Sequence, residues 1–256
     1  MNLPVGGLTQ TVNDVYGVNM VHEPRKSPRA RRHDANLTRI LDAAMDLVAE
    51  GGLEALSMAR LAGAVDYTPG ALYRYFDSKD ALLAQLVSQV LEEAQGFLSR
   101  AQAALPQGSF PLTRVFALAH GYRAFARERP HSFGLLAMTM AEPRVLLRET
   151  AHAEPVTKRV MATLELLALA LGDAEATGQL DDGDVAERTV CLFATLQGLL
   201  QLHKQARFAP GVLELDRLVP IATRTLLIGW GAKVRAADAA LEKAAALKDH
   251  PLGETS

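Results

Sequence analysis

The sequence contains a single cysteine, Cys191, so the chain can form no internal disulfide. Small secreted folds that depend on a disulfide framework are excluded, and a reducing cytoplasm is the expected setting. No window reaches the roughly 18 consecutive apolar residues of a membrane span. The N-terminus lacks the basic and apolar regions of a secretory signal. We therefore expect a cytoplasmic protein with no membrane partner.

Aromatic residues are scarce, at 5% of the chain, and no stretch alternates apolar and polar residues as a half-buried strand does. Hydrophobic residues nevertheless make up 49%, which is enough for a packed core. Ala and Leu dominate from Leu37 onward, and both favour helix over strand. These features predict an all-α fold.

Signatures of catalysis and metal binding are also missing. The sequence has no glycine-rich phosphate loop and no nucleophile elbow. His120, His131, His152 and His203 fall in different predicted helices, without an i, i+4 pair or a neighbouring cysteine. We expect no enzyme, no metal and no cofactor, and we expect Cys191 to be a small core residue.

The net charge of −2 and the pI of about 6.4 exclude a uniformly basic nucleic-acid binder, so any DNA contact must come from a local patch. Residues 1–33 show no apolar period and are expected to be a flexible arm. The end of this arm is basic, with Arg25, Lys26, Arg29, Arg31 and Arg32. This basic run is either a solubilising tail or a set of extra DNA contacts.

Four predicted helices follow the arm. The first begins near Asp34 and stops at Gly51-Gly52. Ser57 caps the second, which continues to about Val65. Thr68 caps the third, and Pro69 stands at its first helical position, where a missing N–H costs nothing. Ser78 caps a long fourth helix that continues toward Leu105, and this order of two short helices between longer ones predicts a helix-turn-helix.

The cap at Thr68 also sets the phase of the third helix. Leu72 and Phe76 lie four residues apart and are predicted to point inward. The residues predicted to face outward are Gly70, Ala71, Tyr73, Arg74 and Tyr75.

The run from Leu37 to Leu83 resembles the N-terminal domain of the TetR (tetracycline-repressor) family. The resemblance is carried by TPGALYRYF from Thr68 to Phe76 and by SKDAL from Ser78 to Leu82. The family usually has Gly-Val before the hydroxyl residue, whereas this chain has Asp66-Tyr67. Asp tolerates the left-handed turn conformation, while Tyr67 either packs against the first helix or reaches a phosphate.

The resemblance implies contacts with a double-stranded DNA operator. The DNA phosphate backbone is expected to be contacted by Thr68, Tyr73 and Lys79. For Lys79 the reason is that a cation is otherwise disfavoured at a helix N-terminus. Arg74 is the candidate for a bidentate guanine contact, beside Pro69, Gly70 and Ala71 at the bases, and Tyr75 is a further DNA-binding candidate. Two structural alternatives stay open: Tyr73 packs only on the fourth helix, or Arg74 forms a salt bridge with Asp66 or Asp77.

Beyond residue 105 we expect further helices at 111–129, 131–141, 144–151, 156–177, 184–207, 217–235 and 236–248. The resemblance implies that this body binds a small hydrophobic ligand and forms a homodimer through its last long helices. The predicted pocket residues are Phe116, His120, Tyr122, Phe125, Phe133, Met138, Met161 and Phe193, with Met140 and Leu164 as further candidates. The predicted dimer residues are Leu192, Leu196, Leu199, Leu200, Ala222 and Gly229. The alternative is that both helices are buried within one subunit.

These expectations divide the chain into an arm (1–33), a helix-turn-helix domain (34–80), a helical regulatory and dimerisation domain (81–250) and a tail (251–256). They describe a DNA-binding transcriptional regulator, most simply a ligand-responsive repressor on a palindromic operator. The first alternative is a helical enzyme or small-molecule carrier whose N-terminal helices only pack. The second is a regulator that responds to a protein partner or to nothing.

Overall fold

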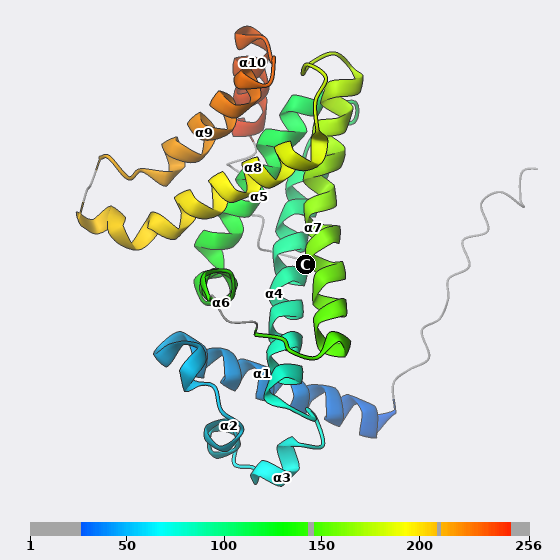
Figure 1. Cartoon of the computed structure of the whole chain (residues 1–256), viewed down its shortest axis with the longest axis vertical. Helices are drawn as coiled ribbons and strands as arrows, with labels where there is room; N and C mark the ends of the chain where they lie inside the picture. Colours follow the sequence, from blue (N-terminus) through cyan, green and yellow to red (C-terminus); the bar gives the residue numbers. More distant parts are fainter. Residues whose placement is uncertain (1–26, 143–145, 209–210, 247–256) are drawn as a thin grey trace, which may run out of the picture. The chain divides into compact units, whose positions relative to one another are not determined.

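The computed structural model describes residues 27–142, 146–208 and 211–246 (Figure 1). Within these ranges all regular structure is helical, as predicted, and none is strand. The helices are α1 (Pro28–Ala55), α2 (Met58–Ala64), α3 (Pro69–Leu72), α4 (Lys79–Ala103), α5 (Pro111–Glu128), α6 (Pro130–Ala141), α7 (Thr150–Ala176), α8 (Val185–Gln201), the 3-10 helix η1 (Leu202–Phe208), α9 (Leu215–Gly229) and α10 (Val234–Ala245).

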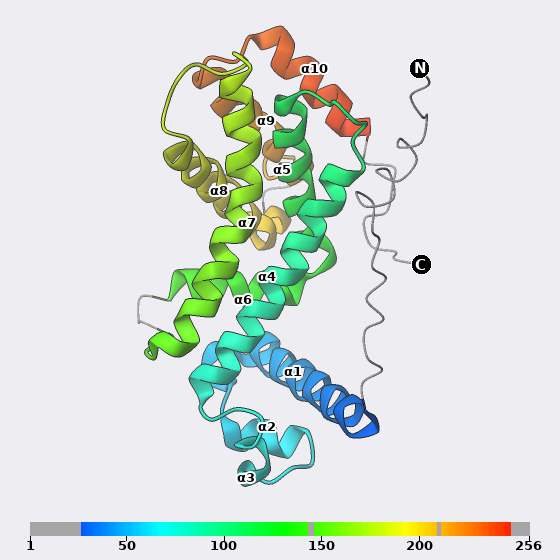
Figure 2. The ribbon, with the colours of Figure 1, turned by 90° about the vertical axis from the view of Figure 1, so that its right-hand side faces the viewer.

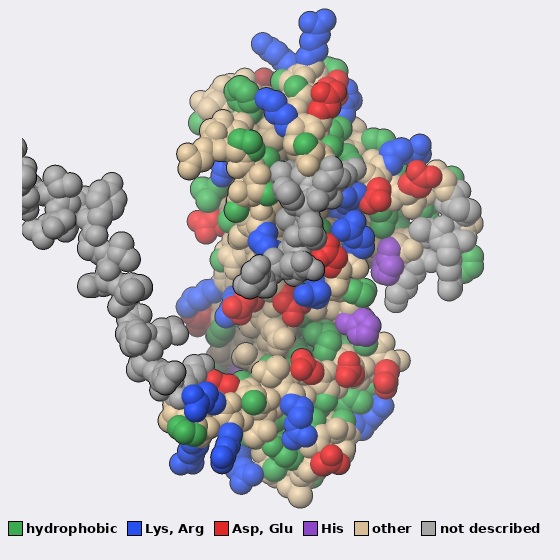
Figure 3. Space-filling view, turned by 180° about the vertical axis from the view of Figure 1, so that it is seen from behind, with side chains coloured by type: hydrophobic (Ala, Val, Ile, Leu, Met, Phe, Trp, Pro, Cys, Tyr) green, Lys and Arg blue, Asp and Glu red, His purple; other side chains and the backbone are tan. Residues whose placement is uncertain are grey.

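Helix α1 begins at Pro28 and not at the predicted Asp34. The Ser27 hydroxyl accepts a hydrogen bond from the Ala30 N–H at 3.2 Å, and Pro28 occupies the first helical position, so Ser-Pro is the true start signal. Arg29, Arg31 and Arg32 are therefore exposed helical residues, and basic side chains gather where the described chain begins (Figure 3). The rest of the predicted arm and the tail 251–256 lie outside the described residues.

Short helices α2 and α3 are anchored by buried leucines. Leu56, Leu61 and Leu72 are fully buried, as is Ile40 of α1. The predicted stop at Gly51-Gly52 is a kink between two helical segments, because Gly52 adopts a φ of 69° that other residues rarely adopt. The buried leucines thus hold α2 and α3 in place although each is too short to be stable alone.

In the body, α4 packs against both α5 and α7 (Figures 1 and 2). Gly121 permits the close approach of α5, since a Cβ there would lie 2.9 Å from both the Ala101 Cβ and the Phe97 carbonyl oxygen. Phe97 and Phe125 meet at this crossing with ring centroids 5.9 Å apart, and both are buried. The crossing forms the centre of the core.

Two predicted helix boundaries in the body are wrong because proline is tolerated near a helix start. The predicted helices 144–151 and 156–177 are instead a single helix, α7, with Pro155 in its second turn, and residues 146–149 are not helical. Pro155 is exposed, so water can replace the one backbone hydrogen bond that it removes. Pro220 is accommodated in the same way in α9.

The other boundary errors lie at the ends of α8 and α9. Helix α8 turns into the 3-10 helix η1 at Leu202, within the predicted 184–207. Helix α9 stops at Gly229, before the predicted residue 235, because Gly231 adopts a φ of 98°. The helices predicted at 111–129, 131–141 and 236–248 are confirmed with small shifts in their ends.

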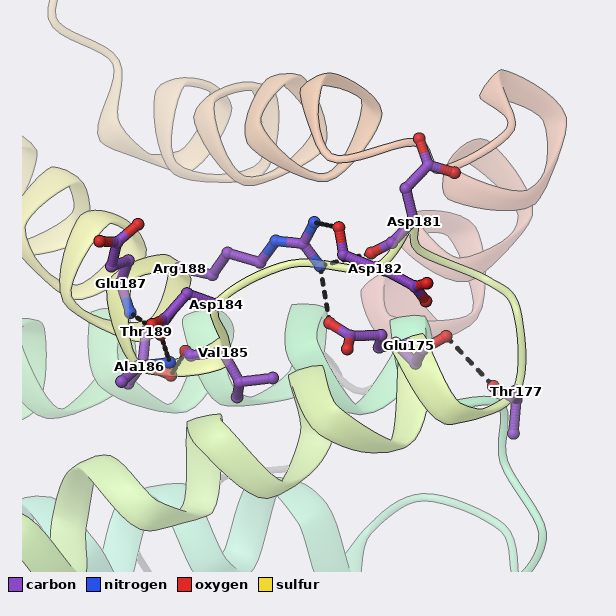
Figure 4. Close-up of polar contacts among 11 residues, drawn as sticks. Glu175, Thr177, Asp181, Asp182, Asp184, Val185, Ala186, Glu187, Arg188 and Thr189 are labelled. Carbon is purple, nitrogen blue, oxygen red and sulfur yellow. Dashed lines mark hydrogen bonds and ion pairs between the residues drawn. The ribbon is translucent and has the colours of Figure 1, made fainter.

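A buried arginine ties together the loop before α8 and the end of α7 (Figure 4). Arg188 donates to the Glu175 carboxylate at 3.1 Å and to the carbonyl oxygens of Asp181 and Asp182 at 2.8 and 3.3 Å. A Cβ at Gly183 would lie 2.3 Å from the guanidinium, so only glycine fits there. The same loop joins α9, because the Asp181 N–H donates to the Trp230 carbonyl at 2.9 Å.

Replacing Arg188 by Met is expected to lower the free energy of unfolding by about 2 to 3 kcal/mol, measured by urea denaturation. The loss lies below that of a fully buried pair because the Glu175 side chain remains 23% exposed. Arg224→Met is the matched control, since Arg224 pairs with the more exposed Asp238 and should cost much less. Equal losses in the two variants would contradict this role for Arg188.

Candidate functional site

The turn between α2 and α3 is built by the two residues that depart from the family pattern. Asp66 takes the left-handed conformation, with a φ of 56°, as expected for a turn that usually has glycine. Tyr67 packs inward: the Arg39 guanidinium lies 5.1 Å from the centre of its ring, and the Tyr75 ring stacks on it at 6.4 Å. Of the two alternatives for Tyr67, packing against α1 is therefore the one observed.

The start of α3 matches the prediction. The Thr68 hydroxyl accepts a hydrogen bond from the Ala71 N–H at 3.3 Å, and Pro69 occupies the first helical position. Gly70 is exposed, and a Cβ added to it would meet no atom of the protein within 4 Å. Internal packing therefore does not require glycine at this position.

The predicted phase of α3 and the turn after it is also confirmed. Leu72 and Phe76 are buried, whereas Tyr73 is 53% exposed and does not pack away on α4. Arg74 is exposed, and its guanidinium forms no ion pair within the described ranges, so neither of the salt bridges considered for it is present. Tyr75 is half-buried against Tyr67 and presents only part of its ring.

Lys79 has a structural partner that the sequence did not reveal. Its ammonium donates to the Leu53 carbonyl, just after the kink in α1, at 3.4 Å. This corrects the expectation that nothing in the protein accounts for a cation at the start of α4. The contact is long, the side chain is exposed, and an ammonium has three donors, so Lys79 keeps hydrogen-bonding capacity for a phosphate.

A cavity of about 290 Å³ lies in the helical body, between α4, α6, α7 and α8. Within the described part of the chain, no charged side chain lines it. The lining residues are Leu83, Val87, Leu91, Ala94, Tyr122, Leu136, Thr139, Met140, Leu146, Leu147, Val156, Val160, Thr163, Leu164 and Phe193. A concave, apolar cavity of this size with a few polar groups is typical of a small-molecule site.

Only part of this lining was predicted. Tyr122 and Phe193, and the further candidates Met140 and Leu164, line the cavity. The other predicted pocket residues lie elsewhere. Phe125 and Phe133 are buried in the core, and Phe116 and His120 line a separate small cavity beside α9 and α10. Met138 does not line the main cavity, and Met161 is 58% exposed. The prediction favoured aromatic and Met side chains, whereas aliphatic residues of α4 and α7 form most of the wall.

At one end of the cavity, Tyr122 donates a hydrogen bond to the side-chain oxygen of Gln197. Burial raises the pKa of Tyr122, so its hydroxyl stays protonated. The amide nitrogen of Gln197 is buried and has no hydrogen-bond partner. The polar groups at this end are therefore neutral.

The segment before α7 touches both the cavity and the turn before α4. Leu146 and Leu147 line the cavity, and the next residue, Arg148, donates its backbone N–H to the Asp80 carboxylate at 3.1 Å. Asp80 lies in the first turn of α4, next to Lys79. A displacement of Leu147 therefore bears directly on the start of α4.

His152 extends this contact to the loop after α3. Its Nε2 atom lies 3.5 Å from an Asp77 carboxylate oxygen and 3.3 Å from one of Glu149. Asp77 immediately precedes the Ser78 cap of α4, and Val156, one turn after His152, lines the cavity. We call this pair of contacts, Arg148 to Asp80 and His152 to Asp77, the latch.

The exposed faces of α8 and α9 differ from those predicted for a dimer. Leu192, Leu196 and Leu200 are buried in their own subunit, Leu199 and Ala222 are half-buried, and Gly229 is exposed. The prediction for the three buried leucines was wrong because α8 is apolar on two faces, and the sequence does not say which face the subunit uses. The apolar or small residues that remain exposed include Val190, Cys191, Ala194 and Gly198 of α8 and Ile221 of α9. Cys191 is thus not a core residue.

No helix in the described ranges is long and apolar enough to cross a membrane. In the same ranges, no group of three or more His, Cys, Asp or Glu side chains is arranged to hold a metal ion.

Comparison with known proteins gives matches over both parts of the chain. Residues 40–86 match the family of bacterial regulatory proteins called the tetR family, and residues 115–226 match the tetracyclin repressor-like C-terminal domain. The first match contains the exposed residues of α3, and the second contains most helices of the body.

Individual relatives are transcriptional regulators. The HTH-type transcriptional regulator UidR of Escherichia coli K12 is 26% identical over 185 residues, which cover 68% of this chain and 88% of UidR. The HTH-type transcriptional repressor KstR of Rhodococcus jostii is 35% identical over 141 residues, covering 54% and 61% of the two chains. The crystal structure of the regulator FadR from Bacillus subtilis with stearoyl-CoA has a TM-score of 0.60 at 15% identity, covering 75% of this chain and 98% of FadR, which shows a shared fold.

Thr68→Ala is expected to lower the free energy of unfolding by about 1 kcal/mol, because the Ala71 N–H loses its acceptor. Thr68→Ser keeps a hydroxyl at the cap and should retain most of the stability. Urea denaturation followed by circular dichroism measures both variants. If Ser destabilises as much as Ala does, the hydroxyl does not cap α3.

Proposed function

Because the chain belongs to the tetR family of bacterial regulatory proteins, we propose that it is a ligand-responsive transcriptional repressor that binds a palindromic operator as a homodimer. The observation that carries this proposal is the pair Tyr73 and Arg74, exposed beside a helix that Thr68 caps. A regulator of this kind acts in the cytoplasm, where it meets DNA.

The exposed residues suit two kinds of DNA contact. We call the region of α2, α3 and the start of α4 the head. Hydrogen bonds to phosphates can come from Tyr73, from Lys79 and from the Thr68 end of α3, and these bonds would fix the position of the head on the duplex. Arg74 has the planar fork of donors that matches the O6 and N7 atoms of guanine. Gly70 and Ala71 are small residues, so the protein backbone of α3 can come close to the DNA groove. The open space around Gly70 supports this.

Dimerisation is supported by the exposed stripe on α8 and α9. Val190 is 58% exposed and Ile221 is 48% exposed, and the small residues Ala194 and Gly198 between them allow close helix contact. Two copies joined along this stripe form a helix bundle related by a twofold axis. Such a dimer presents two reading heads, which match a palindrome whose half-sites lie about 34–36 Å apart.

We propose that the cavity is the sensor site and that the latch helps to transmit its state. A ligand shifts the equilibrium only if it binds the DNA-competent and DNA-incompetent forms with different affinity. Leu146, Leu147 and Val156 line the cavity on the same segment that contacts Asp77 and Asp80, so pressure on the lining changes the support of α4. FadR, which shares the fold, is a regulator that binds stearoyl-CoA, and this supports a hydrophobic ligand here.

Replacing Arg74 by Ala is expected to weaken specific DNA binding by about 1 to 3 kcal/mol, because the bidentate contact with guanine is lost. Binding is measured by fluorescence anisotropy on a fragment selected from random DNA by the unaltered protein. Arg74→Lys keeps the charge but not the fork, so it should retain non-specific binding and lose sequence preference.

Arg235→Ala is the matched control, since Arg235 is an exposed arginine on α10 of the body. Its affinity should equal that of the unaltered protein. If Arg74→Ala binds like Arg235→Ala, Arg74 makes no specific base contact. If the unaltered protein shows no salt-dependent, sequence-preferring binding, the helical enzyme or carrier becomes the better interpretation.

Replacing Val190 by Asp should convert the dimer to a monomer, because it places a charge on the exposed apolar stripe. Light scattering measures the molecular mass in solution. Leu169→Asp is the control, since Leu169 is 53% exposed on α7, outside the stripe. Dissociation by Leu169→Asp with no effect of Val190→Asp would place the interface elsewhere.

A further inference from the structure

The hydrogen-bonding state of the cavity lining identifies a class of ligand. The lining contains three hydroxyl groups and no other side-chain donor. Tyr122 donates to Gln197, Thr139 donates to the Leu136 carbonyl at 2.8 Å, and Thr163 donates to the Arg159 carbonyl at 2.9 Å. Each of these three hydroxyl donors of the described lining is therefore already used within the protein, and the unpaired amide nitrogen of Gln197 belongs to a residue behind Tyr122 that is not among the lining residues.

The same hydroxyl groups still have acceptor capacity, because a hydroxyl oxygen has two lone pairs. A ligand group that only accepts hydrogen bonds would lose its water partners on entry and find no side-chain donor. A ligand hydroxyl, in contrast, can donate to the oxygen of Thr139 or Thr163. The lining thus favours a neutral ligand group that can donate a hydrogen bond over one that can only accept.

The lining disfavours ionised ligands more strongly than neutral polar ones. Among the residues that the structure describes, neither an arginine, a lysine nor a carboxylate lines the cavity, so the charge of a ligand held inside it would be desolvated without a counter-charge. At about 30 Å³ for each small group, which is the share of one water molecule in the liquid, the cavity of about 290 Å³ holds a ligand of roughly ten non-hydrogen atoms. The walls are mainly Leu and Val from α4 and α7, which suit an aliphatic chain or ring.

We infer that the cavity takes an uncharged aliphatic alcohol of about ten carbons. This inference rests on the proposed function in that it assigns a ligand to the proposed sensor site. It selects against carboxylates, ammonium compounds and simple ketones of the same length.

The test is isothermal titration calorimetry of the full-length protein with four ten-carbon probes. These are 1-decanol, 2-decanone, decanoate and decylammonium. We expect 1-decanol to bind most tightly, 2-decanone about fivefold more weakly, and the two ions at least about 100-fold more weakly. Binding of decanoate as tight as that of 1-decanol, equal binding of the alcohol and the ketone, or no binding of the alcohol would each overturn the inference.

Two variants of α7 locate the site. Thr163→Val removes one acceptor from the lining and should weaken 1-decanol by about threefold while leaving 2-decanone unchanged. Thr157→Val is the matched control, because Thr157 also donates to a carbonyl one turn earlier, that of Ala153, but lies outside the cavity. Equal effects of the two variants on 1-decanol would overturn the assignment to this cavity.

DNA binding is measured separately, so the two proposals can fail independently. If 1-decanol binds as expected and leaves DNA affinity unchanged, the ligand class stands and the proposed ligand response fails. If the protein binds its DNA with sequence preference but binds no alcohol, the repressor stands and the ligand class is overturned.

Discussion

The hydrogen bond from the Ala81 N–H to the Ser78 hydroxyl, 3.0 Å long, determines where α4 begins, and most of the structure depends on that helix. From this cap α4 continues for 25 residues, or about 37 Å at 1.5 Å per residue. Its first turn carries Lys79 and Asp80, and its next turns place Leu83 and Val87 in the cavity wall. Residues of α4 therefore take part both in the proposed DNA contact and in the cavity wall.

The head was largely predictable because its signals are local. Ser57, Thr68 and Ser78 each accept a hydrogen bond from an N–H three residues later, and this geometry depends only on a short stretch of sequence. Thr68 fixes the start of α3, but the helix already ends at Leu72, so Tyr73 and Arg74 are exposed in the turn that follows it. The Lys79 contact with Leu53 was not predicted, and the packing of Tyr67 on Arg39 was only one of two alternatives, because both contacts join segments that are distant in sequence.

The body was predictable only as a set of helices. Its cavity depends on which faces meet, and α4, α7 and α8 are apolar on more than one face, so periodicity does not select the lining. This explains why Phe125 and Phe133 were placed in the pocket although they fill the core, and why Leu192 was placed at the dimer surface although it is buried. The start of α7 was not predicted because a proline such as Pro155 usually interrupts a helix. Pro155 is exposed in the second turn of α7, where water can replace the backbone hydrogen bond that proline removes.

The two candidate sites differ in their free hydrogen-bonding groups, and this difference accounts for the kinds of molecule that each can accept. Arg74 in the head keeps its donors unpaired among the described residues and exposed to solvent, where an anionic backbone can reach them. In the cavity, Thr139 and Thr163 direct their hydroxyl protons to carbonyls of their own helices, which leaves only lone pairs toward the interior. An anion is therefore favoured at the head and disfavoured in the cavity. A single helix, α4, thus connects a surface that favours phosphate with an interior that excludes charge.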